Sequence, residues 1–142
     1  MTRRLILTLF AYLTLAACSR SGPVSVQDAW ANATPVGATV GAVYLELRTS
    51  NADTLLSAAT TVADRIEMHT SREENGMMQM RPLSTLDLQA GERFVFAPGG
   101  AHFMLIGLRQ PLAAGMRIPL TLHFKNAASF TTQVEVVELG SR

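Results

Sequence analysis

The chain is dominated by short runs of alternating apolar and polar residues, separated by turn-forming residues. The alternation is clearest from Leu120 to Lys125, where leucine or phenylalanine alternates with threonine, histidine or lysine. A period of two is typical of β-strands with one buried face. No stretch shows convincing helical spacing. We expect strands at residues 24–30, 41–49, 54–62, 65–70, 77–83, 92–97, 102–108, 116–125 and 129–138.

This pattern predicts one all-β domain. Turn residues separate the expected strands at 34–37, 51–53, 75–76 and 98–100. Eight to nine short strands at this spacing favour a Greek-key β-sandwich. We place this domain at residues 24–138, followed by a short tail at 139–142.

The amino terminus has the layout of a secretory signal peptide. Arg3 and Arg4 precede an apolar run that ends at Ala17, much shorter than the ~20 residues of a membrane span. Leu15-Ala16-Ala17-Cys18 resembles the lipobox of bacterial lipoproteins. The resemblance implies that residues 1–17 are removed and that Cys18 carries the lipid. An ordinary signal peptide cleaved nearby is the alternative.

A lipidated Cys18 would place the protein in the bacterial periplasm, anchored to the cell envelope. Residues 18–23 would then form a short tether to the membrane. Ser19, where Asp could stand, resembles the sorting signal of enteric lipoproteins for the outer membrane, and this resemblance implies that location. Removal of residues 1–17 changes the net charge from +1 to −1, because two arginines are lost. A nearly neutral domain with a single lysine offers no phosphate-binding surface, so we expect no nucleic-acid partner.

One histidine and several methionines gather around Asn75-Gly76, a strong signal for a two-residue hairpin turn. With this turn, Met68 faces Leu83 and His69 faces Pro82. Met80 is then the diagonal neighbour of His69 on the same face, roughly 7–8 Å away at the backbone. The two side chains can converge on one point, although a slip of one residue would exchange the faces.

His102 and Met104 form a second pair of the same kind. They are two apart on an expected strand, so they project from one face roughly 7 Å apart. Two imidazoles and two thioethers make a neutral, soft-to-borderline ligand set that suits Cu(I). Zinc usually prefers thiolate, imidazole or carboxylate ligands.

The neighbouring methionines have simpler interpretations. Met68 and Met77 fall on the opposite face of the hairpin, which we expect to be the core side. Met78 shares the face of Met80 but lies nearer the turn, so it serves packing or acts as a transient entry ligand for copper.

His69, Met80, His102 and Met104, separated by ten, twenty-one and one residues, match the copper-binding motif of the PCu(A)C family of periplasmic copper chaperones. Residues 28–47 resemble the amino-terminal block of that family, and EMHT…GMMQMRP its central block. The resemblance covers roughly residues 24–137. The chain departs from some members because it lacks their tail rich in histidine and methionine. A lipid anchor is also not required in the family.

The resemblance implies a cupredoxin-like sandwich that binds one Cu(I) per monomer through His69, Met80, His102 and Met104. It also implies delivery of copper to the copper-centre subunit of a haem-copper oxidase, such as cytochrome c oxidase, during assembly. An Sco-type protein would act alongside or receive the ion. The membrane would be reached through the lipid on Cys18.

Two other readings use the same domain differently. A periplasmic copper buffer or resistance protein would hold Cu(I) with the same ligands and pass nothing on. A metal-free structural lipoprotein would need none of them. An electron-transfer cupredoxin is excluded because blue-copper sites need a cysteine thiolate, and Cys18 is the only cysteine. We expect no enzyme, since the chain has no nucleophile elbow, zinc-protease motif or phosphate loop.

Overall fold

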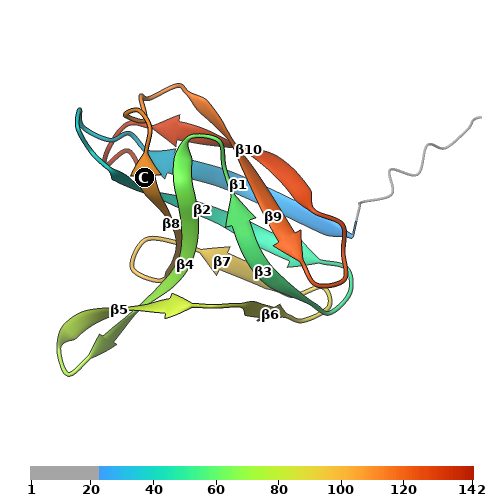
Figure 1. Ribbon diagram of the computed structural model, residues 1–142. Helices are drawn as coiled ribbons and strands as arrows, with labels where there is room; N and C mark the ends of the chain where they lie inside the picture. Colours follow the sequence, from blue (N-terminus) through green and yellow to red (C-terminus); the bar gives the residue numbers. More distant parts are fainter. Residues whose placement is uncertain (1–22) are drawn as a thin grey trace, which may run out of the picture.

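A computed structural model of the chain describes residues 23–142 (Figure 1). The expected signal peptide and the lipid attachment at Cys18 lie outside the described residues. Within residues 23–142 the regular structure is entirely β. The strands are β1 (Val24–Asn32), β2 (Val40–Thr49), β3 (Asp53–Ala59), β4 (Ala63–Glu74), β5 (Met77–Leu83), β6 (Leu86–Leu88), β7 (Arg93–Phe96), β8 (Ala101–Leu108), β9 (Arg117–Phe124) and β10 (Phe130–Val137).

The predicted all-β class is confirmed, with two differences in the strands. The described part has ten strands instead of eight or nine, because β6 is only three residues long and was not expected. β4 is also longer than expected, at 12 residues, since it continues to the hairpin turn. These residues are polar, so they carry little apolar periodicity to indicate a strand.

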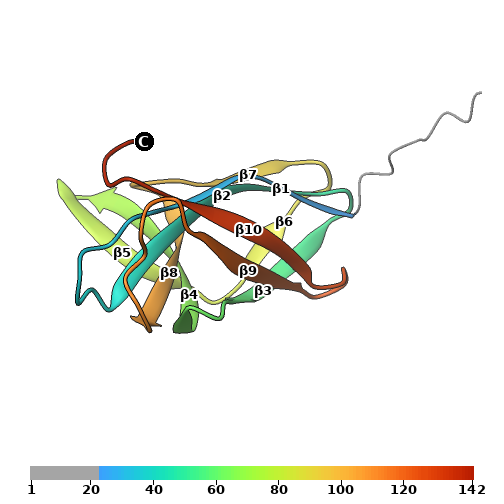
Figure 2. The same ribbon diagram turned by 90° about the horizontal axis from the view of Figure 1, so that it is seen from above.

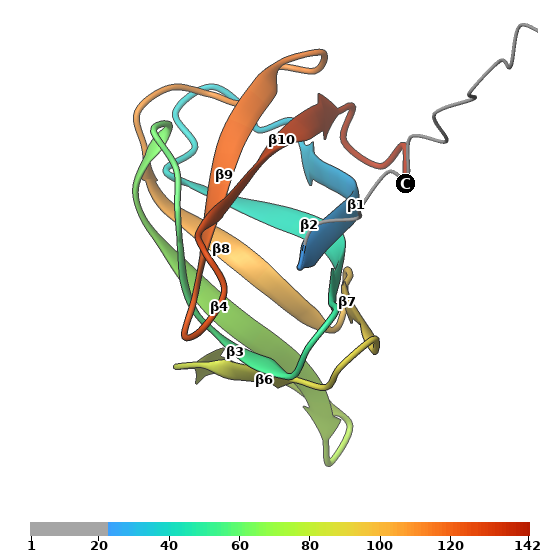
Figure 3. The ribbon, with the colours of Figure 1, turned by 90° about the vertical axis from the view of Figure 1, so that its right-hand side faces the viewer.

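The strands follow one hydrogen-bonded path in the order β5-β4-β8-β2-β1-β10-β9-β3-β6, and β7 pairs with β2. Neighbours in this path are often far apart in sequence, as in β4 beside β8 and β3 beside β9, and this gives Greek-key connections. β1 and β10 are parallel. The sheet curls so that its two halves face each other (Figures 2 and 3).

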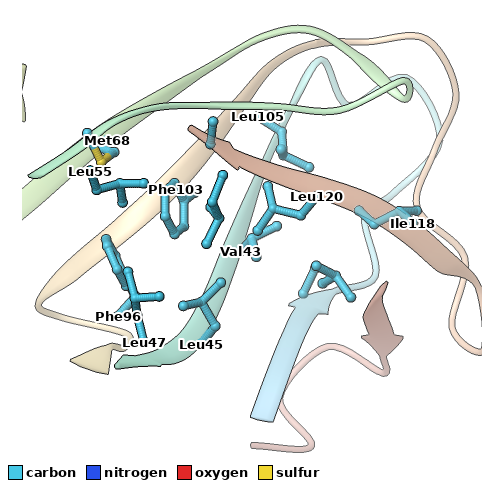
Figure 4. Packing of buried hydrophobic residues seen from close by; sticks show 14 of the residues in the cluster. Val43, Leu45, Leu47, Leu55, Met68, Phe96, Phe103, Leu105, Ile118 and Leu120 are labelled. Carbon is cyan, nitrogen blue, oxygen red and sulfur yellow. The ribbon is translucent and has the colours of Figure 1, made fainter. Parts of the chain in front are cut away.

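The core lies between these two halves (Figure 4). Alternate residues of β2 and β8 point into it from one side, and alternate residues of β9 from the other. The fully buried side chains include Val43, Leu45, Leu47, Phe103, Leu105, Ile118, Leu120 and Leu122. Phe96 stacks on Phe103 with ring centroids 4.3 Å apart. Because period two sends their neighbours to the other face, β2, β4 and β8 also present an outer face away from the core.

Candidate metal centre

The β4–β5 hairpin has the register that the sequence predicts. Asn75 and Gly76 both have positive φ, at 56° and 75°, as a type I′ turn requires. Met68 pairs with Leu83 and His69 pairs with Pro82, so the predicted register is confirmed. The turn therefore sends His69 and Met80 to the same face.

The end of this hairpin extends beyond the body of the protein (Figures 1 and 3). β4 pairs with β8 only as far as Thr70, and the last contact is the Ser71 N–H donating to the Gly100 carbonyl at 3.0 Å. Beyond that point β4 is paired with β5 alone. The hairpin end is a two-stranded ribbon with no core beneath either face.

This projection corrects one prediction about the methionines. Met68, 5 % exposed, lies in the core with Leu55 and Phe103 as expected (Figure 4). Met77 was expected to be in the core but is 64 % exposed. It does lie on the core-side face of the ribbon, but the ribbon has already left the core. Met78, on the other face, is 59 % exposed.

On β8, His102 and Met104 point to the outer face. Their neighbours Phe103 and Leu105 are completely buried on the core side. His102 is itself 6 % exposed and Met104 is half-buried, because β2 and β4 flank β8 on both sides. The predicted separation of faces on this strand is confirmed.

The pairing of β4 with β8 brings the two halves of the motif together. His69 lies directly opposite His102, and Glu67 lies directly opposite Met104. The two imidazole centroids are 5.8 Å apart. An ion bound by two imidazole nitrogens at about 2 Å each would separate the centroids by roughly 5–6 Å. The two rings are thus close enough to share one metal ion.

A hollow of about 400 Å³ opens on the same face. Three of the four predicted ligands line it, namely Met80, His102 and Met104. Met80 is 51 % exposed, so the hollow is reached directly from solvent on the side of β5. Its other walls come from Val40, Gly41, Ala42, Tyr44, Ser71 and Gly99.

The two histidines are held in different ways. His102 Nδ1 lies 3.1 Å from the Gly100 carbonyl oxygen, which can only accept, so Nδ1 donates and Nε2 keeps the lone pair. His69 Nε2 lies 3.0 Å from Glu67 Oε2, while His69 Nδ1 is buried and has no hydrogen-bond partner among the described residues. A buried nitrogen without a partner is costly, so it fits a position that a metal ion completes.

Glu67 and Tyr44 border the site and were not singled out from the sequence. Hydrogen bonds from Arg65 and His69 hold the pKa of Glu67 below its ordinary value, so the carboxylate is ionised at neutral pH. Burial raises the pKa of Tyr44, whose ring lies 6.5 Å from that of His102 and 4.6 Å from that of Trp30. A Glu-x-His spacing on one strand was the available signal for Glu67, because residues two apart share a face.

The donor set limits the metals that would fit. Across residues 23–142 there is no group of three or more His, Cys, Asp or Glu side chains arranged to hold a metal ion. The thioethers of Met80 and Met104 line the hollow beside His102, and thioether ligands favour a soft ion such as Cu(I). Within the same residues, no helix is long and apolar enough to cross a membrane.

Comparison with known families and proteins shows which family the chain belongs to. The family model described as "Putative lipoprotein LpqE-like" matches residues 24–136. The protein described as "Putative lipoprotein Lxx21020" of Leifsonia xyli subsp. xyli (strain CTCB07) is 32% identical over 118 residues, which cover 82% of this chain and 71% of that protein.

Solved structures share the fold. The copper-bound PCuAC domain from PmoF2 superposes with a TM-score of 0.69 at 20% identity, covering 82% of this chain and 94% of that one. Apo-DR1885 from Deinococcus radiodurans has a TM-score of 0.64 at 26% identity, covering 100% and 97% of the two chains. The Cu(I) form of DR1885 has a TM-score of 0.63 at 25% identity, covering 87% and 85%.

These matches confirm the cupredoxin-like β fold and the resemblance to PCuAC copper chaperone domains that the sequence indicated. The chain belongs to the LpqE-like lipoprotein family, and its fold is that of the PCuAC domains.

Proposed function

We propose that this protein is a copper chaperone that binds one Cu(I) through His69, Met80, His102 and Met104. The observation that carries the proposal is the direct pairing of His69 with His102, whose rings lie 5.8 Å apart beside a hollow lined by two thioethers. The donors are neutral and soft. Imidazole and thioether ligands of this kind suit Cu(I) better than Mg²⁺ or Ca²⁺.

The open side of the site supports transfer by ligand exchange. Met80, half of whose surface is exposed, would be the first ligand to leave, because it lies on an edge strand of the sheet. His102, almost fully buried and held by Gly100, would be the last. An incoming ligand could then approach from the β5 side while the copper stays bound. The names of two solved structures with this fold, a copper-bound PCuAC domain and the Cu(I) form of DR1885, support copper binding.

We further propose that the recipient is the copper-centre subunit of a haem-copper oxidase, or an Sco-type protein that serves it. The description of the family as lipoproteins supports a place in the cell envelope. A lipid on Cys18 would hold the carrier at a membrane, with the outer membrane preferred. The proposed recipient follows from the resemblance to the copper-chaperone family, and the proposed membrane follows from the resemblance of the amino terminus to that of bacterial lipoproteins.

The binding test is an anaerobic Cu(I) titration of residues 23–142, which contain the hydrophobic core described above, competed against a chromogenic chelator. The variant His102→Ala, Met104→Ala should lose the tight site and keep its fold. The matched control His123→Ala, Met77→Ala removes the same residue types away from the site. His123 hydrogen-bonds Ser129, and Met77 is exposed on the face of the hairpin opposite to Met80. Binding of one Cu(I) that is unaffected by the first variant would disprove the proposed ligands.

A transfer assay separates the chaperone from a buffer. Copper-loaded protein is mixed with the metal-free copper-centre subunit or the Sco-type protein, and the copper on each is measured with time. A chaperone loads the recipient faster than chelator-buffered copper does. A buffer protein gives no such acceleration. In cells, a metal-free structural lipoprotein predicts unchanged oxidase activity in the His69→Ala and Met104→Ala strains.

A further inference from the structure

We infer that Glu67 is a positioning residue that fixes the tautomer of His69, so that His69 presents Nδ1 to copper while His102 presents Nε2. The inference rests on the proposed copper site and adds to it a residue outside the four ligands. It follows from the hydrogen bonds that each imidazole makes within the described part of the chain.

The first step concerns the proton on His69. Glu67 Oε2 lies 3.0 Å from His69 Nε2. An ionised carboxylate can only accept hydrogen bonds, so Nε2 must carry the proton. A neutral imidazole has one N–H and one lone pair, and the lone pair of His69 is therefore on Nδ1.

The second step concerns the carboxylate itself. Its other oxygen, Oε1, accepts from Arg65 Nε at 2.9 Å. Arg65, Glu67 and His69 are two apart along β4, so all three project from one face. With one oxygen on Arg65 and the other on His69, the carboxylate of Glu67 is held in place by two side chains of its own strand. It therefore acts through His69.

The third step concerns the imidazole nitrogen that makes no hydrogen bond in each of the two rings. The His69 side chain is 13% exposed, and its Nδ1 is the atom left without a partner. His102 shows the opposite arrangement, since its Nδ1 is the donor, to Gly100, and its Nε2 is free. The two rings, whose centroids are 5.8 Å apart, thus have different nitrogens left without a hydrogen-bond partner among the described residues, Nδ1 on His69 and Nε2 on His102. Each tautomer is set by a partner on the ring's own strand or the turn before it.

The difference between the two partners has a chemical consequence. Gly100 supplies a neutral carbonyl, whereas Glu67 supplies a charged carboxylate. A carboxylate bonded to the distal N–H of a ligating histidine orients the ring and raises its basicity, and loss of such a partner typically lowers metal affinity by 10–100-fold. Glu67 should therefore strengthen copper binding by His69 without touching the ion.

The test uses residues 23–142 labelled with ¹⁵N at histidine. Two-dimensional NMR at about pH 8, where free imidazole is neutral, assigns the tautomer of each ring without metal. We expect an Nε2–H tautomer for His69 and an Nδ1–H tautomer for His102. Cu(I) titration should then shift His69 Nδ1 and His102 Nε2, the nitrogens that bind.

Two variants separate positioning from charge. Glu67→Ala should mix the His69 tautomers and weaken Cu(I) binding by about 10–100-fold. Glu67→Gln keeps an acceptor oxygen, so it should retain the tautomer and lose less affinity. Glu74→Ala is the matched control, because Glu74 is on the same strand and pairs with Arg81 at 2.7 Å without contacting a histidine. It should change neither readout.

The inference is overturned if wild-type His69 carries its proton on Nδ1, if copper binds His69 through Nε2, or if Glu67→Ala leaves tautomer and affinity unchanged. Failure of the proposed function looks different. In that case wild-type protein binds no Cu(I), while the metal-free tautomers and their response to Glu67→Ala can still be measured.

Discussion

His69 on β4 lies directly opposite His102 on β8, and the two imidazoles are nearest cross-strand neighbours on the outer face of the sheet. The chain passes through three other strands, β5, β6 and β7, between them. The site is therefore a product of the Greek-key crossover rather than of any local segment. Its two halves meet only when β4 and β8 are paired in this register, because a slip of one residue would turn either histidine toward the core.

This relationship predicts that the two histidines act as a unit. His69→Ala and His102→Ala should each lower Cu(I) affinity by at least about 100-fold, since loss of a ligand costs more than loss of an outer partner. The double variant should lose much less binding free energy than the sum of the two single losses, because either single change already breaks the shared site. Competition titrations of the four proteins measure the coupling. Additive losses would show that the histidines bind separate ions.

Met68 in the core and Met77 on the exposed hairpin end predict losses of stability of very different size. Met68→Ala removes a 5 % exposed side chain from the core and should cost about 2–5 kcal/mol of unfolding free energy. Met77→Ala removes a side chain that is 64 % exposed, and should change stability by about 0.5 kcal/mol or less. Urea unfolding followed by circular dichroism measures both. A large loss for Met77→Ala would mean that the ribbon packs against something in solution.

Asp53 predicts a pH dependence of stability that is independent of the metal site. Burial alone would raise its pKa, but hydrogen bonds from the Ala127, Thr54 and Asn126 N–H groups and the Asn126 side chain outweigh this and hold the pKa below its ordinary 3.8. These contacts tie the start of β3 to the loop after β9. The ionised form is the one that the folded state prefers.

Because the folded-state pKa is lowered, this contribution is fully present above the ordinary carboxyl pKa and is lost as the pH falls through the folded value. Wild-type protein should therefore lose stability below about pH 4. Asp53→Asn should be less stable at neutral pH and should show a smaller further loss on acidification. Denaturant midpoints from neutral to acid pH test this, with Asp87→Asn as the exposed control. Parallel pH profiles for wild type and Asp53→Asn would contradict the assignment.

Local pattern was enough to predict most of the strands and the hairpin register. The Asn75-Gly76 turn admits one common geometry, so the pairing of His69 with Pro82 followed by counting. Period two likewise placed His102 and Met104 away from Phe103. In both cases the residues that determine the structure lie within a few positions of the feature that they predict.

Other features depend on distant parts of the chain. Period two assigns Met77 to a face, but whether that face is covered depends on where β8 begins, some 24 positions later. The pairing of β4 with β8, and the contact of Glu67 with His69, need the tertiary register and the side-chain conformations. The resemblance to a copper-binding family supplied the grouping of the four ligands, which no local periodicity contains.

Met78 and Met77 predict different effects on the rate of copper transfer. Met78 lies two residues from Met80 on the same face, nearer the hairpin end, and is 59 % exposed. Its Cα atom is then roughly 7 Å along the strand from that of Met80, on the β5 side from which we propose that an incoming ligand reaches the site. Met77, 64 % exposed, points to the opposite face of the same ribbon.

Leucine keeps the size and apolar character of methionine but removes the sulfur. Met78→Leu should therefore slow Cu(I) exchange with an acceptor by about three- to tenfold, which is about 0.7–1.4 kcal/mol of barrier, and leave the equilibrium affinity unchanged. Met77→Leu should change neither quantity. Stopped-flow transfer to a chromogenic chelator measures the rate, and equilibrium competition measures the affinity. Equal slowing by both variants would show that exposed apolar surface, rather than a thioether on the site face, controls the exchange.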